Sequence, residues 1–111
     1  MKSISNIVSL LFVTAIGLAQ SGKISGIVTD DRTREPLIGA NVLVGGTKLG
    51  ATTDVDGRYS ILKVQPGSYS VSASMLGYTK ATKHEVEVYI DRTTPLDFKL
   101  SETSFEMQEI S

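Results

Sequence analysis

Residues 52–61 read TTDVDGRYSI, and the interpretation of this stretch decides the fold of the chain. Two aspartates, Asp54 and Asp56, stand directly before Gly57. Carboxylate oxygens at such a spacing are ligands in calcium-binding loops. The same three residues also favour a tight turn between strands, because Asp side chains accept backbone hydrogen bonds and glycine readily adopts positive φ. The first interpretation gives the chain a chemical site, and the second gives it a structural motif.

The spacing of the loop argues against an EF-hand. That motif has the pattern D-x-[DN]-x-[DN]-G and ends with a bidentate glutamate at its twelfth position. When Gly57 is aligned with the glycine of the motif, the first position is Thr52 and the twelfth is Lys63. A lysine ammonium would repel the cation there. We therefore interpret Asp54, Asp56 and Gly57 as a hairpin turn and predict no metal site, with Asp54 and Asp56 left as a calcium candidate of another geometry.

The segments around this turn predict an all-β domain. In residues 69–75, YSVSASM, apolar and polar side chains alternate with a period of two, which is typical of a half-buried strand. Six further strands are expected at residues 23–30, 38–46, 48–53, 58–62, 84–90 and 95–100. Seven short strands separated by turn residues favour a β-sandwich, and Tyr59 and Ile61 are expected to enter its core directly after the turn.

Three local features add detail to this sandwich. Gln65-Pro66-Gly67 suits a type II turn, because proline presets φ at the second position and glycine accepts positive φ at the third. Gly26, within the first strand, indicates a bulge or the close approach of another backbone. Residues 38–46 are apolar on both faces around Leu43, which predicts a strand at the centre of its sheet.

Residues 1–19 predict a secretory signal peptide. Lys2 is followed by an apolar stretch at residues 7–18, and two small residues, Gly17 and Ala19, precede the expected cleavage site. The apolar stretch is too short for an ordinary membrane span. The alternative is a buried N-terminal helix, but the many small and β-branched residues would form a mediocre helix. The chain is therefore expected to be exported.

The remaining sequence predicts one domain at residues 20–101 and an acidic tail or linker at residues 102–111, which contain three glutamates and no basic residue. The chain has 111 residues, a formal net charge of −1 and no cysteine. So small a charge gives no electrostatic case for binding nucleic acid. The absence of cysteine excludes thiol catalysis and cysteine-ligated zinc, and it leaves an apolar core to hold the domain together.

Other reactive side chains are few. His84 is the single histidine and is expected to be a solvated strand residue, because no second histidine or cysteine accompanies it. The serines of residues 69–75 are expected on the solvent face of their strand, and no nucleophile-elbow pattern occurs. Tyr78 and Tyr89 would suit stacking on sugars, but packing at the edge of the core is the favoured interpretation. No catalytic residue and no cofactor is predicted, and the chain is not expected to be an enzyme.

Five motifs follow one another along the chain. They are GIVTD at 26–30, PLIGANV at 36–42, TDVDGRY at 53–59, PGSY at 66–69 and GY at 77–78. Together they resemble the carboxypeptidase-regulatory-like domain, a seven-stranded, transthyretin-like and Ig-like β-sandwich. The resemblance covers residues 22–100, and its specificity comes from the order of the motifs, since each motif alone is short.

The resemblance implies a non-catalytic accessory domain. Members of the family accompany some zinc carboxypeptidases or stand at the N-terminus of TonB-dependent outer-membrane receptors, including SusC-like ones, before the plug and barrel. The order of signal peptide, domain and acidic tail is similar to the receptors. It implies a domain in the periplasm or at the outer membrane of a Gram-negative-type cell, here as a fragment without plug and barrel, whose partners are downstream receptor domains or another protein.

A free secreted module that binds carbohydrate or a protein surface is the alternative. The zinc ligands of the carboxypeptidases are not found in this sequence, so no peptidase activity is carried over.

Overall fold

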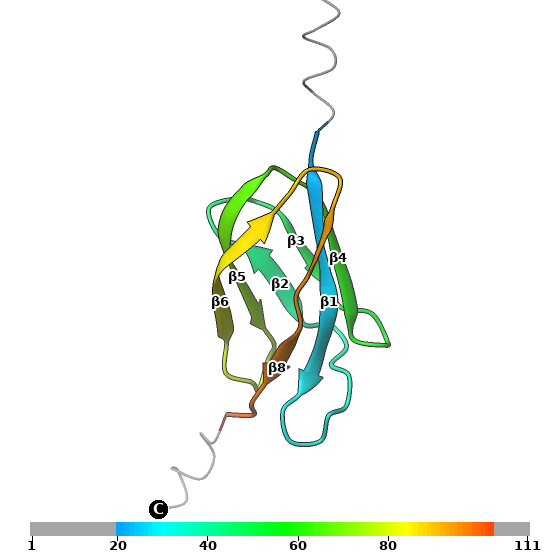
Figure 1. Cartoon of the computed structure of the whole chain (residues 1–111). Coiled ribbons are helices and arrows are strands. Elements are labelled where there is room, and N and C mark those ends of the chain that lie inside the picture. Colours follow the sequence, from blue (N-terminus) through cyan, green and yellow to red (C-terminus); the bar gives the residue numbers. More distant parts are fainter. Residues whose placement is uncertain (1–19, 104–111) are drawn as a thin grey trace, which may run out of the picture.

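The computed structural model describes residues 20–103, which form a sandwich of two β-sheets (Figure 1). The strands are β1 (Gly22–Asp30), β2 (Asn41–Val44), β3 (Gly50–Thr52), β4 (Arg58–Val64), β5 (Gly67–Ser74), β6 (Ala81–Val88), β7 (Thr93–Pro95) and β8 (Phe98–Leu100). The predicted all-β sandwich is confirmed. Between residues 20 and 103 the chain contains no helix long and apolar enough to cross a membrane.

The first sheet is built around β1. This strand pairs antiparallel with β4 on one side and, on the other side, in parallel first with β7 and then with β8. Ile24 lies opposite Ile61 of β4 and Thr94 of β7, and Val28 lies opposite Phe98 of β8. Because β1 contributes its backbone to both ladders, it holds this sheet together.

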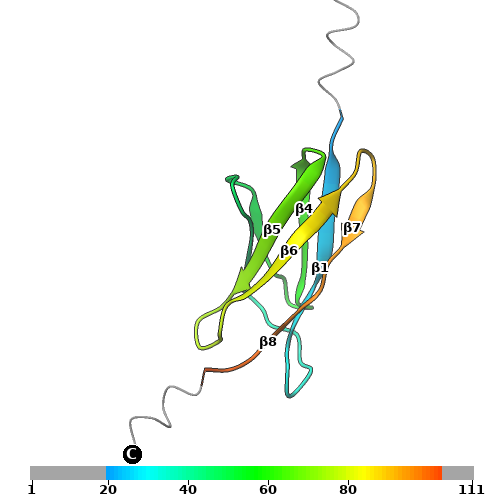
Figure 2. The ribbon, with the colours of Figure 1, turned by 60° about the vertical axis from the view of Figure 1, so that its left-hand side comes forward.

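The second sheet has the strand order β3-β2-β5-β6, and its neighbouring strands are all antiparallel. β6 forms one edge of this sheet, and β7 lies at an edge of the first sheet. The two edges meet on the same side of the sandwich, where the Thr94 hydroxyl of β7 donates a hydrogen bond to the Glu87 carbonyl of β6. Figure 2 shows β6 running beside β1 and β7 at this side.

The core lies between the two sheets. Fifteen apolar side chains of residues 20–103 are buried there: Ile24, Val28, Leu37, Ala40, Val42, Val44, Tyr59, Ile61, Val64, Val71, Ala73, Val86, Val88, Phe98 and Leu100. In β4, Tyr59 and Ile61 are buried while Arg58 and Ser60 are exposed, as the alternation predicts. Each fully buried large apolar side chain contributes about 1.5–3 kcal/mol to folding. Since residues 24–100 supply a continuous apolar core to the described domain, we expect this domain to fold on its own.

The strand expected at residues 95–100 is divided, so the described residues contain eight strands where seven were predicted. Leu96 and Asp97 lie between β7 and β8 and belong to neither strand, although the Leu96 N–H still donates to the Ser25 carbonyl of β1 at 2.8 Å. The Asp97 carboxylate instead accepts a hydrogen bond from the Ile27 N–H at 3.0 Å. At Gly26 a Cβ atom would lie 1.8 Å from the Leu96 carbonyl oxygen, which confirms the predicted close approach of another backbone.

The hairpin predicted at Asp54–Gly57 is wrong, although the turn itself is present. β3 pairs with β2 in the second sheet, whereas β4 pairs with β1 in the first. The turn therefore carries the chain from one sheet to the other. Local sequence specifies a tight turn, but the partner of each flanking strand is decided by tertiary packing.

Two smaller expectations also need correction. β2 lies between β3 and β5, as predicted for a central strand, but Leu43 is 52% exposed, so only one face of the strand is buried. Gly67 does not occupy the third position of a type II turn. It has φ 156° and is the first residue of β5, opposite Val88.

Candidate functional site

The segment that follows β3 is tied to the loop before β2 by a buried threonine. The Thr53 hydroxyl donates a hydrogen bond to the Leu37 carbonyl at 2.5 Å and accepts one from the Ala40 N–H at 2.9 Å. Only 4% of Thr53 is exposed. Buried polar groups of the backbone need such partners, so Thr53 satisfies two groups that water cannot reach.

The next residues form the turn. One carboxylate oxygen of Asp54 accepts hydrogen bonds from the Asp56 N–H at 2.9 Å and the Arg58 N–H at 3.0 Å. The Gly57 N–H donates to the Asp54 carbonyl at 2.9 Å, and Gly57 has φ 75°. A Cβ atom on Gly57 would lie 2.8 Å from the Val28 carbonyl oxygen. Both conformation and space therefore require glycine at this position.

The calcium candidate, Asp54 and Asp56, lies in this exposed turn. The Oδ1 atom of Asp54 is already an acceptor for two backbone N–H groups, which is the arrangement of an Asx turn. Lys63, the residue at the twelfth loop position, lies near the far end of β4 at φ 59°. Within residues 20–103 no group of three or more histidine, aspartate or glutamate side chains is placed to hold a metal ion.

Pro66 and Gly67 lie where the chain crosses back from β4 to β5. The Tyr69 hydroxyl donates a hydrogen bond to the Gln65 carbonyl at 2.7 Å. A tyrosine that bonds to a backbone carbonyl a few residues upstream is the tyrosine corner of immunoglobulin-like sandwiches. The Tyr69 ring lies 3.7 Å from the position that a Cβ atom on Gly67 would occupy. Tyr69 therefore stabilises the PGSY motif at the connection between the two sheets.

The buried carboxylate of Asp30, at the end of β1, stabilises the loop that follows this strand. Asp30 accepts hydrogen bonds from the N–H groups of Arg32 at 2.8 Å and Thr33 at 3.0 Å, and from the Tyr78 hydroxyl at 2.7 Å. The Thr33 N–H, followed by the Tyr78 hydroxyl, lowers the pKa of Asp30 below its ordinary value of 3.8. The bond to Asp30 raises the pKa of Tyr78 to about 12. Tyr78 packs at the edge of the core, as predicted.

His84 is exposed in β6, as expected of a solvated strand residue. Its Nδ1 atom lies 2.9 Å from the Ser70 Oγ atom of β5. The pairing of the two strands shifts here, and Glu85, the next residue, has φ 56°. The irregularity is a β-bulge, in which two residues of β6 face one residue of β5.

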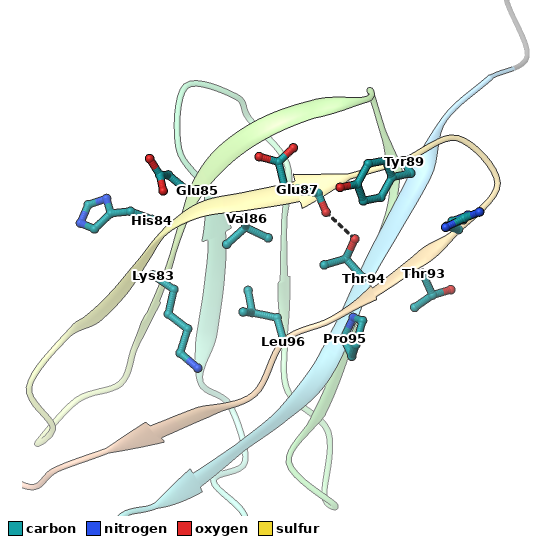
Figure 3. Close-up of a pocket in the computed structure, with 11 residues that line it drawn as sticks. Lys83, His84, Glu85, Val86, Glu87, Tyr89, Thr93, Thr94, Pro95 and Leu96 are labelled. Atoms are coloured by element: carbon teal, nitrogen blue, oxygen red, sulfur yellow. Dashed lines mark hydrogen bonds between the residues drawn. The ribbon is translucent and has the colours of Figure 1, made fainter.

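A groove of about 500 Å³ lies between β6 and β7 (Figure 3). We define the β6–β7 groove by Lys83, Val86, Tyr89, Arg92, Thr94 and Leu96. Figure 3 shows Lys83, Val86, Thr94 and Leu96 between the two segments, while His84, Glu85 and Glu87 project from the other side of β6. The space between the strands is therefore lined by apolar side chains with a cation.

The prediction for Tyr89 is wrong, because this side chain is 54% exposed and lines the groove instead of packing at the edge of the core. The Arg92 guanidinium lies 6.0 Å from the centre of the Tyr89 ring. Sequence reasoning missed the groove because its walls belong to edges of two different sheets. The available signal was Tyr89 itself, which falls on the polar face of the alternation in residues 84–90 together with Glu85 and Glu87.

Comparison with known proteins gives one family. A model of the carboxypeptidase regulatory-like domain matches residues 23–101. The TonB-dependent receptor SusC of Bacteroides thetaiotaomicron is 39% identical over 77 residues, which cover 69% of this chain and 7% of the receptor. Carboxypeptidase D of Anas platyrhynchos is 36% identical over 80 residues, which cover 72% of this chain and 6% of that protein. The chain thus corresponds to a small part of each relative.

A solved structure supports the same fold. A chain of a type II cohesin–X–dockerin complex from Acetivibrio cellulolyticus superposes with a TM-score of 0.60 and 26% identity. The match covers 69% of the present chain and 52% of that chain.

Proposed function

The chain belongs to the carboxypeptidase regulatory-like domain family, and on this premise we propose that it is a non-catalytic accessory domain of a TonB-dependent outer-membrane receptor. In this proposal residues 1–19 direct export, and the sandwich faces the periplasm. The observation that carries the proposal is the 39% identity to the receptor SusC, together with the signal-peptide pattern before the matched domain.

The position of the two ends of the domain supports a place within a longer chain. The chain enters β1 at one pole of the sandwich and leaves after β8 at the opposite pole (Figure 1). The buried core side chains of the described residues lie between these two points. A domain whose two ends lie at its surface can be joined in series to neighbouring domains without disturbing its core.

An antibody raised against residues 20–103 tests the proposal. In fractions of the cells that produce the protein, we expect the antigen in the outer-membrane fraction and, after isolation, an N-terminus at Gln20. The same antibody, pre-absorbed with the domain, is the control. Antigen in the culture medium or the cytoplasm, with none in the outer membrane, would contradict the proposal.

The exposed Tyr89 favours a second candidate, a free secreted module that binds carbohydrate. Its ring and the Arg92 guanidinium lie together at the groove, and aromatic rings offer sugars a stacking surface. A glycan array would detect such binding, which Tyr89→Ala should abolish while Tyr69→Phe, at the corner, leaves it unchanged. Absence of binding at millimolar glycan would rule this candidate out.

A further inference from the structure

The β6–β7 groove presents a strand edge that another strand can use. Among the strands of residues 20–103, β6 pairs with β5 alone, and the opposite side of β6 faces the groove. There the Glu87 carbonyl accepts a hydrogen bond from the Thr94 side chain at 2.7 Å, where a neighbouring strand would offer a backbone N–H. An extended peptide can add to such an edge through backbone hydrogen bonds, while pockets beside it select side chains.

The charge inside the groove is positive. The Lys83 ammonium donates a hydrogen bond to the Asp97 carbonyl at 2.6 Å and lies 5.4 Å from the centre of the Phe98 ring. An ammonium has three donors, so two remain for another acceptor. The glutamates of β6 project from the other side of the strand (Figure 3). The groove therefore suits an extended segment that carries apolar side chains and a carboxylate on one face.

Residues 104–111 of this chain, SFEMQEIS, have that pattern. In an extended strand Phe105, Met107 and Glu109 share one face, because side chains alternate with a period of two. The two apolar side chains match the Val86 and Leu96 wall, and Glu109 matches Lys83. Glu106 falls on the opposite face, which provides an internal control.

Residues 101–103 lead away from the groove of their own copy. Thr79 N–H donates to the Ser101 carbonyl and Thr103 N–H donates to the Gly77 carbonyl, so residues 101–103 run antiparallel to residues 77–79 and away from β6.

We propose that residues 104–111 of a second copy add to β6 as an antiparallel strand, with Phe105 and Met107 on the Val86–Leu96 wall and Glu109 paired with Lys83. This inference goes beyond the accessory role proposed above and does not depend on the location of the protein in the cell. Its test uses purified protein, so its failure would leave the fractionation experiment unaffected.

The experiment measures self-association of the chain from Gln20 to Ser111 by sedimentation at increasing concentration. We expect Lys83→Glu and Glu109→Lys each to raise the dissociation constant at least about tenfold, because each places like charges together. A mixture of the Lys83→Glu copy with the Glu109→Lys copy should restore association, because the pair is present again with its charges exchanged. Only docking between two copies gives this result.

Matched controls carry the same charge changes elsewhere. Lys99→Glu, on an exposed position of β8, and Glu106→Lys, on the opposite face of the segment, should change the dissociation constant by less than about threefold. Circular dichroism and thermal unfolding would show that each variant is folded. Absence of self-association in the unmodified chain, failure of the mixture to restore it, or equal loss in the control variants would each overturn the proposal.

Discussion

At the scale of single residues, the Thr53 hydroxyl links two buried backbone groups. Thr53→Val keeps the shape of the side chain but leaves the Ala40 N–H and the Leu37 carbonyl without their partner. We expect a loss of about 1–3 kcal/mol in the free energy of unfolding, measured with urea. Thr52→Val is the matched control, because Thr52 is exposed. This substitution should lower the free energy of unfolding by less than about 0.5 kcal/mol. Equal effects of the two substitutions would disprove this role.

The turn of Asp54 and Asp56 gives a prediction about calcium. If the Asp54 carboxylate serves the turn and neither aspartate binds a cation, millimolar calcium should leave the thermal unfolding midpoint unchanged, and Asp56→Asn should behave as the unmodified chain does. A binding site at one hundred times its dissociation constant would instead add about 2.7 kcal/mol. Stabilisation of that size, abolished by Asp56→Asn, would show a cation site.

The bond between Asp30 and Tyr78 predicts how stability depends on pH. The lowered pKa of Asp30 means that its contribution is present above pH 3.8 and is lost as the pH falls through the lower pKa of the folded state. The raised pKa of Tyr78 means that its contribution is present below pH 10.0 and is lost as the pH rises towards about 12. Tyr78→Phe should weaken the pH dependence of the free energy of unfolding in both the acidic and the alkaline range, as measured with urea. If this free energy changed with pH as much in the variant as in the unmodified chain, the prediction would be contradicted.

At the scale of elements, Gly26 lets the segment between β7 and β8 lie against β1. Gly26→Ala would place a Cβ atom 1.8 Å from the Leu96 carbonyl oxygen and should cost about 1–3 kcal/mol or more, because the strands have to separate. Gly46→Asn is the comparison, since Gly46 has positive φ, open space around it, and asparagine tolerates that conformation. Unfolding in urea measures the stability of both variants. An equal loss of stability in the two would show that backbone conformation alone matters.

Much of the element order could be read from the sequence, because alternation and turn residues are local. The inward positions of Tyr59, Ile61 and Phe98 follow from a period of two. The same period does not predict that β3 and β4 belong to different sheets, because a tight turn can join strands of one sheet or of two. The break between β7 and β8 depends on the Asp97 carboxylate taking the place of a backbone acceptor for β1.

The candidate site was less predictable than the fold. TDVDGRY could be assigned to a turn, because its hydrogen bonds run between residues close in sequence. The type II turn predicted at PGSY was wrong, because Gly67 already pairs with Val88 as the first residue of β5. The β6–β7 groove joins residues from two edges and exists only once both sheets are assembled. Tyr89 was therefore assigned to the edge of the core, although its ring lies open to solvent.

At the scale of the whole molecule, the parallel pairing of β1 with β7 and β8 determines how the domain responds to mechanical force. The chain enters at the start of β1 and leaves at the end of β8, at opposite poles (Figure 1). Tension between residues 20 and 103 therefore pulls β1 and β8 in opposite directions along their length. Their hydrogen bonds are loaded together in shear instead of breaking one after another.

Single-molecule stretching would reveal this resistance. The chain lacks cysteine, so introduced cysteines at residues 20 and 103 would be unique attachment points. Attachment at Ser68 and Glu87, which face each other in β5 and β6, would peel that pair open from one end. We expect the first geometry to require the larger unfolding force, and equal forces would contradict it. A domain connected in this way would transmit tension between its neighbours while remaining folded.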